Sequence, residues 1–193
     1  MNGAAGLPAI AMLWLGMALF AAALVVARWR REAEAGGKRD PLSLLGIAVQ
    51  GAAFVVAATG GTRVVLDPLG AIALIEAGVV AALMASALTL FVWATRTMGR
   101  NWSLVARTRS DHALVTTGPF AHIRHPIYTA LALVVIALAV ALGHDARLLV
   151  ALPLYALGTW LRVRIEERLL ATMFGSAYRA YALRVKRFVP GIL

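Results

Sequence analysis

GPFAHIRHPIYTALALVVIALAVALG, residues 118–143, begins polar and ends as an uninterrupted apolar run. His122, Arg124 and His125 stand directly in front of Pro126. Proline is well tolerated at the first helical position, because its missing N–H would have no partner there. The stretch therefore predicts a helix that begins at Pro126 and continues into a membrane. We call the polar residues directly before it, His122, Arg124 and His125, its polar mouth.

Four other stretches carry no charge or almost none, and the chain as a whole is 61% hydrophobic. A helix needs roughly 20 residues to cross the hydrocarbon core of a bilayer. By that measure residues 7–27, 41–62 and 68–95 are predicted spans in addition to residues 126–143. A fifth stretch, residues 148–161, is shorter. We expect an all-α integral membrane protein with about five transmembrane helices. It forms a single membrane domain of residues 1–193, in which residues 1–95 supply three packing helices and residues 96–193 the functional half.

Basic residues indicate the orientation of these helices. Of the 19 Lys and Arg residues, all but Arg63 and Arg147 follow the first, third and fifth apolar stretches. The positive-inside rule then places the N-terminus outside and the C-terminus in the cytoplasm. The net charge of +10 thus indicates topology and contact with anionic lipids, and no nucleic-acid partner is expected.

Charged residues follow the short fifth stretch at a depth that a full span would occupy. Ionisable groups at such depth usually face a cavity or one another. Arg162 and Glu166 are four residues apart and can pair, whereas Glu167 is rotated by about 100°. His125 and Tyr128, three residues apart, can face one spot at the start of the preceding helix. These features predict a polar pocket at the cytoplasmic boundary; the alternative is a set of interfacial anchors beside a solvated helix end.

Three further features leave alternatives open. Glu76, within the third stretch, is either a functional carboxylate or, as we favour, a residue near the outer interface. Residues 97–120 are either a functional connector or an Arg-rich surface loop. The tail is predicted to break at Gly175 and continue as an interfacial amphipathic helix, which either lies on the membrane or covers the pocket. No cysteine occurs, and the four histidines are not spaced for haem or zinc, so no metal is expected.

Several motifs resemble the isoprenylcysteine carboxyl methyltransferase family, which is related to membrane phospholipid methyltransferases. They are GRNWS (99–103), TTGPFAHIRHPIY (116–128), RIEERLL (164–170) and FGSAYRAYALRVKRFVP (174–190), in that order. The resemblance covers residues 96–190. Phe120 and Ala121 depart from the Tyr and basic residue of many members, but the Arg-His-Pro-x-Tyr core is intact.

This resemblance implies a helical enzyme that uses S-adenosylmethionine without a Rossmann domain and methylates a lipophilic substrate, in the first place a carboxylate of the isoprenylcysteine type. Methylation of a small thiol or a lipid amine, or a non-enzymatic scaffold or transporter subunit, are the alternatives. The expected partners are a lipophilic small molecule or a prenylated substrate, together with membrane lipids. The resemblance implies cofactor contacts from Gly118, Arg124, His125, Pro126, Tyr128, Glu166 and Glu167. It implies catalytic roles for Arg162 and Glu167, and substrate contacts from Arg162, Trp160 and Tyr178.

Overall fold

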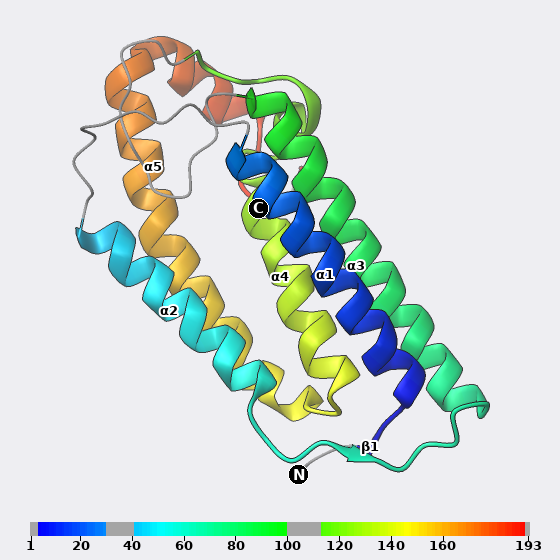
Figure 1. The fold of residues 1–193 in the computed structure, drawn as a ribbon. Helices are drawn as coiled ribbons and strands as arrows, with labels where there is room; N and C mark the ends of the chain where they lie inside the picture. The colour runs from blue at the N-terminus through cyan, green and yellow to red at the C-terminus, as the bar shows by residue number, and fades with distance from the viewer. Residues whose placement is uncertain (1–3, 30–40, 100–112, 192–193) are drawn as a thin grey trace.

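The computed structural model describes residues 4–29, 41–99 and 113–191, which form five α-helices joined by short elements (Figure 1). The helices are α1 (Leu7–Trp29), α2 (Pro41–Ala58), α3 (Ala71–Met98), α4 (Pro126–Ala141) and α5 (Leu148–Arg184). The predicted all-α membrane fold is confirmed. Most of the GRNWS motif, and the basic residues of 30–40 and 100–112, lie outside the described residues.

Successive helices run in opposite directions and pack around α4 (Figure 1). α1 packs on α3, α3 on α4, and α2 on α5, while α4 contacts all four other helices. The ring centroids of Phe20 and Phe91 lie 4.6 Å apart between α1 and α3, with the rings tilted. Val135 and Ala139 of α4 are buried in the cluster that joins α2 to α5. Many buried positions are alanine, as expected where helices approach closely in lipid.

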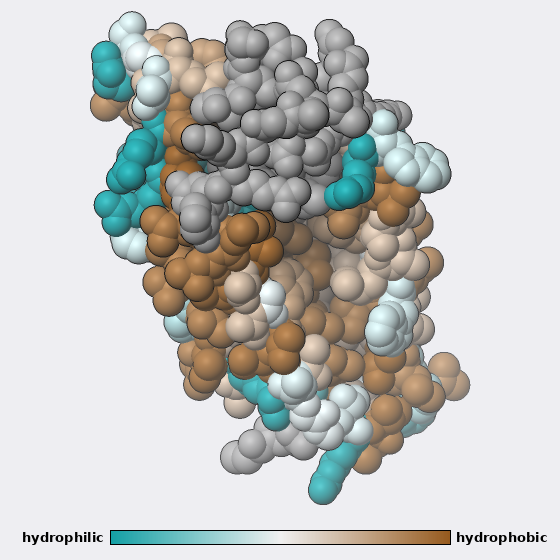
Figure 2. All heavy atoms as spheres, turned by 60° about the vertical axis from the view of Figure 1, so that its left-hand side comes forward, coloured by the Kyte–Doolittle hydropathy of each residue, from teal (hydrophilic) through white to brown (hydrophobic). Residues whose placement is uncertain are grey.

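Length and composition set two groups of helices apart. Among the described residues, α1, α3 and the segment Asp145–Arg184 are long and apolar enough to cross a membrane, whereas Leu42–Ala58 and Pro126–Ala141 are apolar but shorter. Figure 2 shows mostly hydrophobic side chains across the middle of one face and hydrophilic ones toward its ends. The number of five spans stays a prediction. The fifth helix is longer than its uncharged stretch indicates, since α5 continues through the charged residues that follow it.

The end of the molecule opposite the start of α4 contains two short strands that the sequence did not predict. β1 (Ala4–Ala5) pairs in parallel with β2 (Arg63–Val64) and ties the segment before α1 to the loop between α2 and α3. Nearby, Glu76 in α3 accepts the backbone N–H of Gly6 at 3.0 Å. Glu76 therefore supports the start of α1, far from the polar mouth of α4.

Two predicted helix boundaries are confirmed. A 3₁₀ turn, η2 (Gly118–Ala121), precedes α4, and Pro126 is the first residue of α4. Gly175 adopts φ 51° and ψ −120° and kinks α5. L-residues with a side chain are strained at positive φ, so glycine permits this change of direction. The residues after the kink return toward the start of α4.

Candidate active site

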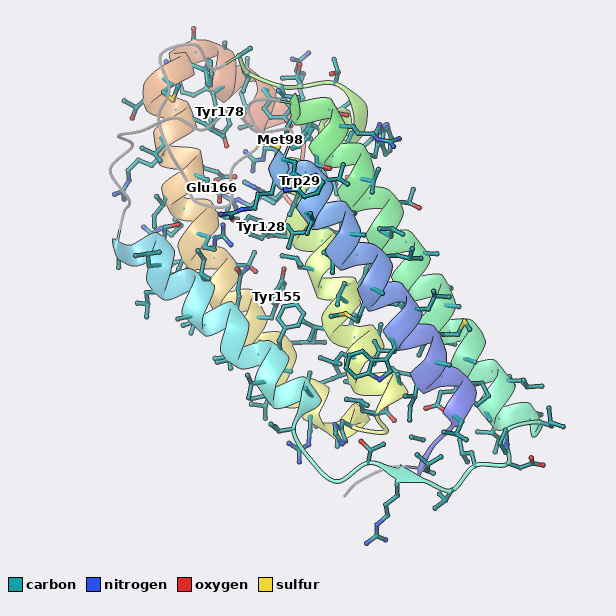
Figure 3. All side chains as sticks on the ribbon, viewed as in Figure 1. Trp29, Met98, Tyr128, Tyr155, Glu166 and Tyr178 are labelled. Atoms are coloured by element: carbon teal, nitrogen blue, oxygen red, sulfur yellow. The ribbon has the colours of Figure 1, made fainter. Side chains whose placement is uncertain are left out.

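Polar side chains from α4, α5 and the C-terminal segment meet at the end of the bundle where α4 begins. Figure 3 shows Tyr128 of α4 and Glu166 of α5 pointing toward each other there, with Tyr178 beyond them and Tyr155 deeper in the bundle. Hydrogen bonds and ion pairs join a set of residues that we call the polar cluster: Arg124, His125, Tyr128, Arg162, Glu166, Glu167 and Arg187.

Glu166 is the carboxylate nearest to α4. It accepts a hydrogen bond from the Tyr128 hydroxyl. Nδ1 of His125 lies 3.7 Å from Oε2 of Glu166, and Nη2 of Arg162 lies 3.8 Å from Oε1. The contact between Arg162 and Glu166 is the pair that their spacing of four residues predicts.

Glu167 faces a different set of cations, as its rotation around the helix predicts. Its two oxygens accept from Nε and Nη2 of Arg187 at 3.0 and 2.7 Å. Nη2 of Arg124 and Nε2 of His125 each lie 3.3 Å from Oε1. The hydrogen bond to Glu167 raises the pKa of Arg187 above its usual value. The His125 ring thus stands between the two carboxylates, with one nitrogen toward each.

The C-terminal segment holds the start of α4 by its backbone. The N–H groups of Arg124 and His125 donate to the carbonyls of Lys186 and Arg187 at 2.8 and 2.9 Å. The Thr129 hydroxyl donates to the carbonyl of Phe188 at 3.1 Å. The tail therefore packs against the residues at the start of α4, and whether it covers a pocket or lies on the membrane stays a prediction. Sequence reasoning did not single out Arg187, whose partner Glu167 is 20 residues away and across the Gly175 kink.

Gln50 of α2 is a second residue that sequence reasoning missed. Its side-chain oxygen accepts from Nη1 of Arg162 at 3.1 Å, and its nitrogen donates to the Thr159 hydroxyl at 2.8 Å. The Arg162 guanidinium also lies over the Tyr128 ring, 5.1 Å from its centroid. A lone amide within the uncharged residues 41–62 was the available signal, because polar side chains inside a membrane helix usually bind across helices.

Tyr178 and Trp160, the predicted substrate contacts besides Arg162, differ in their burial. Tyr178 is buried, and its hydroxyl has no hydrogen-bond partner among the described residues; the same holds for Nε of Arg124. Trp160 is half exposed, lies under the Arg164 guanidinium at 4.6 Å and stands outside the polar cluster.

Gly118 has a structural reason to be glycine. Its φ is 58°, and a Cβ there would come within 2.6 Å of the Thr97 hydroxyl. It shapes the turn before α4, and within the described part of the chain no contact joins it to the polar cluster. Pro126 likewise shapes the mouth, as the buried first residue of α4.

Sequence comparison connects this region to a known family. A sequence profile of the isoprenylcysteine carboxyl methyltransferase (ICMT) family matches residues 79–172. The protein-S-isoprenylcysteine O-methyltransferase of Schizosaccharomyces pombe is 33% identical over 98 residues, which are 48% of this chain and 40% of that protein. The enzyme of the same name from Tribolium castaneum is 32% identical over 102 residues, 50% of this chain and 35% of that protein. The chain thus matches less than half the length of either relative.

Structural comparison extends the similarity over nearly the whole chain. The eukaryotic intramembrane Ras methyltransferase ICMT superposes with a TM-score of 0.55 at 21% identity, covering 96% of this chain and 68% of that one. At this identity the match shows a shared fold. The family resemblance that the motifs predict is confirmed by the profile and the two relatives.

Proposed function

From its resemblance to the isoprenylcysteine carboxyl methyltransferase family, we propose that this chain is an integral membrane methyltransferase. It transfers the methyl group of S-adenosylmethionine to the carboxylate of a lipophilic substrate of the isoprenylcysteine type. The observation that carries the proposal is the polar cluster, in which His125 lies between two glutamates that cations and a tyrosine hydroxyl also contact.

The residues of the cluster fit the charged end of this cofactor. A methionyl group carries an ammonium and a carboxylate, and the cluster offers both carboxylates and guanidinium groups. Two buried polar atoms nearby, the Tyr178 hydroxyl and Nε of Arg124, have no partner among the described residues. Such atoms are costly unless something binds them. Glu166 and Glu167 would receive the ammonium or ribose hydroxyls, while Arg124 and the start of α4 would receive the carboxylate.

S-adenosylmethionine, when bound, supplies an electrophilic methyl group on a sulfonium. The chain then needs to align an acceptor with it and to exclude water, because proximity and orientation account for much of such a rate enhancement. Tyr128 and His125 hold Glu166 and Glu167 in place by direct contacts. The C-terminal segment adds Arg187, which donates to Glu167.

Among the possible methyl acceptors, a carboxylate fits the polar cluster best. A carboxyl group with a pKa of about 4 is already ionised at neutral pH and needs no general base. It needs a cation to place it, and Arg162 sits one helical turn before Glu166 with its guanidinium over Tyr128. A thiol or an amine would have to lose a proton, and His125, the histidine of the cluster, already contacts both glutamates.

The site is proposed to face the cytoplasm. Helices of alternating direction bring the C-terminal ends of α1 and α3, after which the basic residues follow in the sequence, to the end of the bundle that holds the polar cluster (Figure 1). An acceptor with an isoprenyl tail could keep that tail in lipid while its carboxylate enters the cluster. Prenylated proteins or smaller prenylated acids are the expected substrates, and residues 96–193 the part that binds the cofactor.

The test is methyl transfer from methyl-labelled S-adenosylmethionine by the purified protein in lipid. Three acceptors are offered: S-farnesyl-N-acetylcysteine, a free alkyl thiol and phosphatidylethanolamine. Label on the farnesyl acid that mild base releases as methanol identifies a methyl ester and supports the proposal. Base-stable label on the thiol or the amine alone would assign the alternative acceptors, and no label on any of them would contradict the proposal.

A further inference from the structure

Gln50 lies in the half of the sequence that carries no family motif, yet it touches a residue of the proposed active site. Its side chain is only 5% exposed. Burying an amide without hydrogen bonds is costly. Gln50 avoids this cost because both ends of its amide have partners on α5, Thr159 and Arg162.

The direction of the Gln50 amide is fixed by chemistry. A guanidinium only donates hydrogen bonds, so the amide oxygen has to face Arg162. The amide nitrogen then faces the Thr159 hydroxyl, one turn earlier on α5, which accepts its hydrogen. Thr159 therefore holds Gln50 in the orientation in which Gln50 holds Arg162.

Two glycines allow α2 and α5 to meet at this level. A Cβ on Gly46 would come within 2.5 Å of Cγ of Arg162, and one on Gly158 within 2.8 Å of the carbonyl of Gly46. The Arg162 side chain therefore crosses the surface of α2 where a methyl group would block it. Small residues that let backbones approach in this way are typical of helix pairs in membranes.

Arg162 is held from two sides as a result. Gln50 of α2 contacts Nη1, and the Tyr128 ring of α4 lies under the guanidinium. Glu166 is farther from Arg162, at 3.8 Å, than a normal hydrogen bond. The neutral amide of Gln50 orients the guanidinium without adding a counter-charge to the one that Glu166 supplies.

We propose that Gln50 is a positioning residue that aims the Arg162 guanidinium at the carboxylate of the substrate and sets the preference for an acid over a neutral analogue. The inference rests on the proposed function and deepens it by giving α2 a part in substrate selection. It predicts that loss of the amide weakens recognition of the acid, while cofactor binding stays unchanged.

The test uses the full chain in lipid, with Gln50→Met, Gln50→Glu and the control Ser43→Ala. Ser43 is fully buried on the same helix, and its hydroxyl has no hydrogen-bond partner among the described residues. The readouts are KM and kcat for S-farnesyl-N-acetylcysteine, calorimetric binding of that acid and of its carboxamide, and binding of S-adenosylhomocysteine.

Gln50→Met is expected to raise KM for the acid at least tenfold and to leave kcat, carboxamide binding and S-adenosylhomocysteine binding within about twofold. Gln50→Glu keeps an acceptor but adds a counter-charge, so it too should weaken acid binding and not carboxamide binding. Ser43→Ala should change nothing by more than about twofold.

Three outcomes separate this inference from the proposed function. Parallel weakening of acid and carboxamide in Gln50→Met would overturn the inference and assign Gln50 to packing alone. A wild type that binds both ligands equally would overturn it as well. A wild type that prefers the acid but transfers no methyl group would contradict the proposed function only; selective loss of acid binding in Gln50→Met would still support the role of Gln50.

Discussion

At the scale of single residues, the site depends on two adjacent glutamates that the helix turns toward different partners. Glu166 faces Tyr128 and Arg162, while Glu167 faces Arg124 and Arg187. Each carboxylate has at least one donor from outside α5, Tyr128 for Glu166 and Arg124 and Arg187 for Glu167. Charged groups are kept inside a membrane protein in this way, because an unpaired charge there is expensive.

The Tyr128 hydroxyl is the contact whose loss affects Glu166 most directly. Tyr128→Phe should weaken binding of S-adenosylhomocysteine about tenfold, because a hydrogen bond to a charged group contributes about 1.5–3 kcal/mol. Tyr155→Phe is the matched control, since the Tyr155 hydroxyl donates to the carbonyl of Tyr128 and contacts neither glutamate. Calorimetry checks both variants, and an equal loss in the two would argue against a specific role of the Tyr128 hydroxyl.

At the scale of helices, the sequence predicted most boundaries because their signals are local. Pro126 starts α4, Gly175 breaks α5, and a spacing of four residues pairs Arg162 with Glu166. Each of these follows from the geometry of a single helix. The contacts of Gln50 and Arg187 depend on which helices are neighbours and on where the tail returns. Hydrophobic periodicity does not contain that information.

The kink at Gly175 sets the direction of the end of α5 and of the tail that follows it. No atom lies within 4 Å of a Cβ added there, but φ is 51°. Gly175→Ala should therefore act through backbone strain alone. It is expected to cost about 1–3 kcal/mol and to displace the tail that brings Arg187 to Glu167.

Thermal unfolding and limited proteolysis of the tail measure this effect. Gly78→Ala is the control, because Gly78 lies within α3 with nothing near its Cβ and no positive φ. We expect a lower melting temperature and faster cleavage of the tail in Gly175→Ala only. Equal behaviour of the two variants would mean that the kink does not depend on glycine.

At the scale of the whole molecule, a bundle of alternating helices separates two ends with different roles. One end contains the paired strands β1 and β2 and the contact between Glu76 and Gly6. The other contains the polar cluster and the returning tail. The hydrophobic surface between them (Figure 2) is the part expected to lie in lipid.

The proposed orientation can be tested cleanly because the chain has no cysteine. Single cysteines at Leu69 and Val189, both exposed and at opposite ends of the bundle, report on the two sides. In intact cells, a membrane-impermeant maleimide should label Leu69→Cys and should label Val189→Cys only after lysis. The reverse pattern would place the polar cluster outside and contradict the orientation inferred from the basic residues.

The most direct test of the central claim is calorimetric titration of the purified protein with S-adenosylhomocysteine. Wild type should bind saturably at one site, and Glu167→Gln, shown by thermal unfolding to be folded, should bind more than tenfold more weakly. Glu76→Gln, which changes a carboxylate at the far end of α3, should bind like wild type. Absence of binding to folded wild type, or equal binding by Glu167→Gln, would contradict the assignment of the polar cluster as a cofactor site.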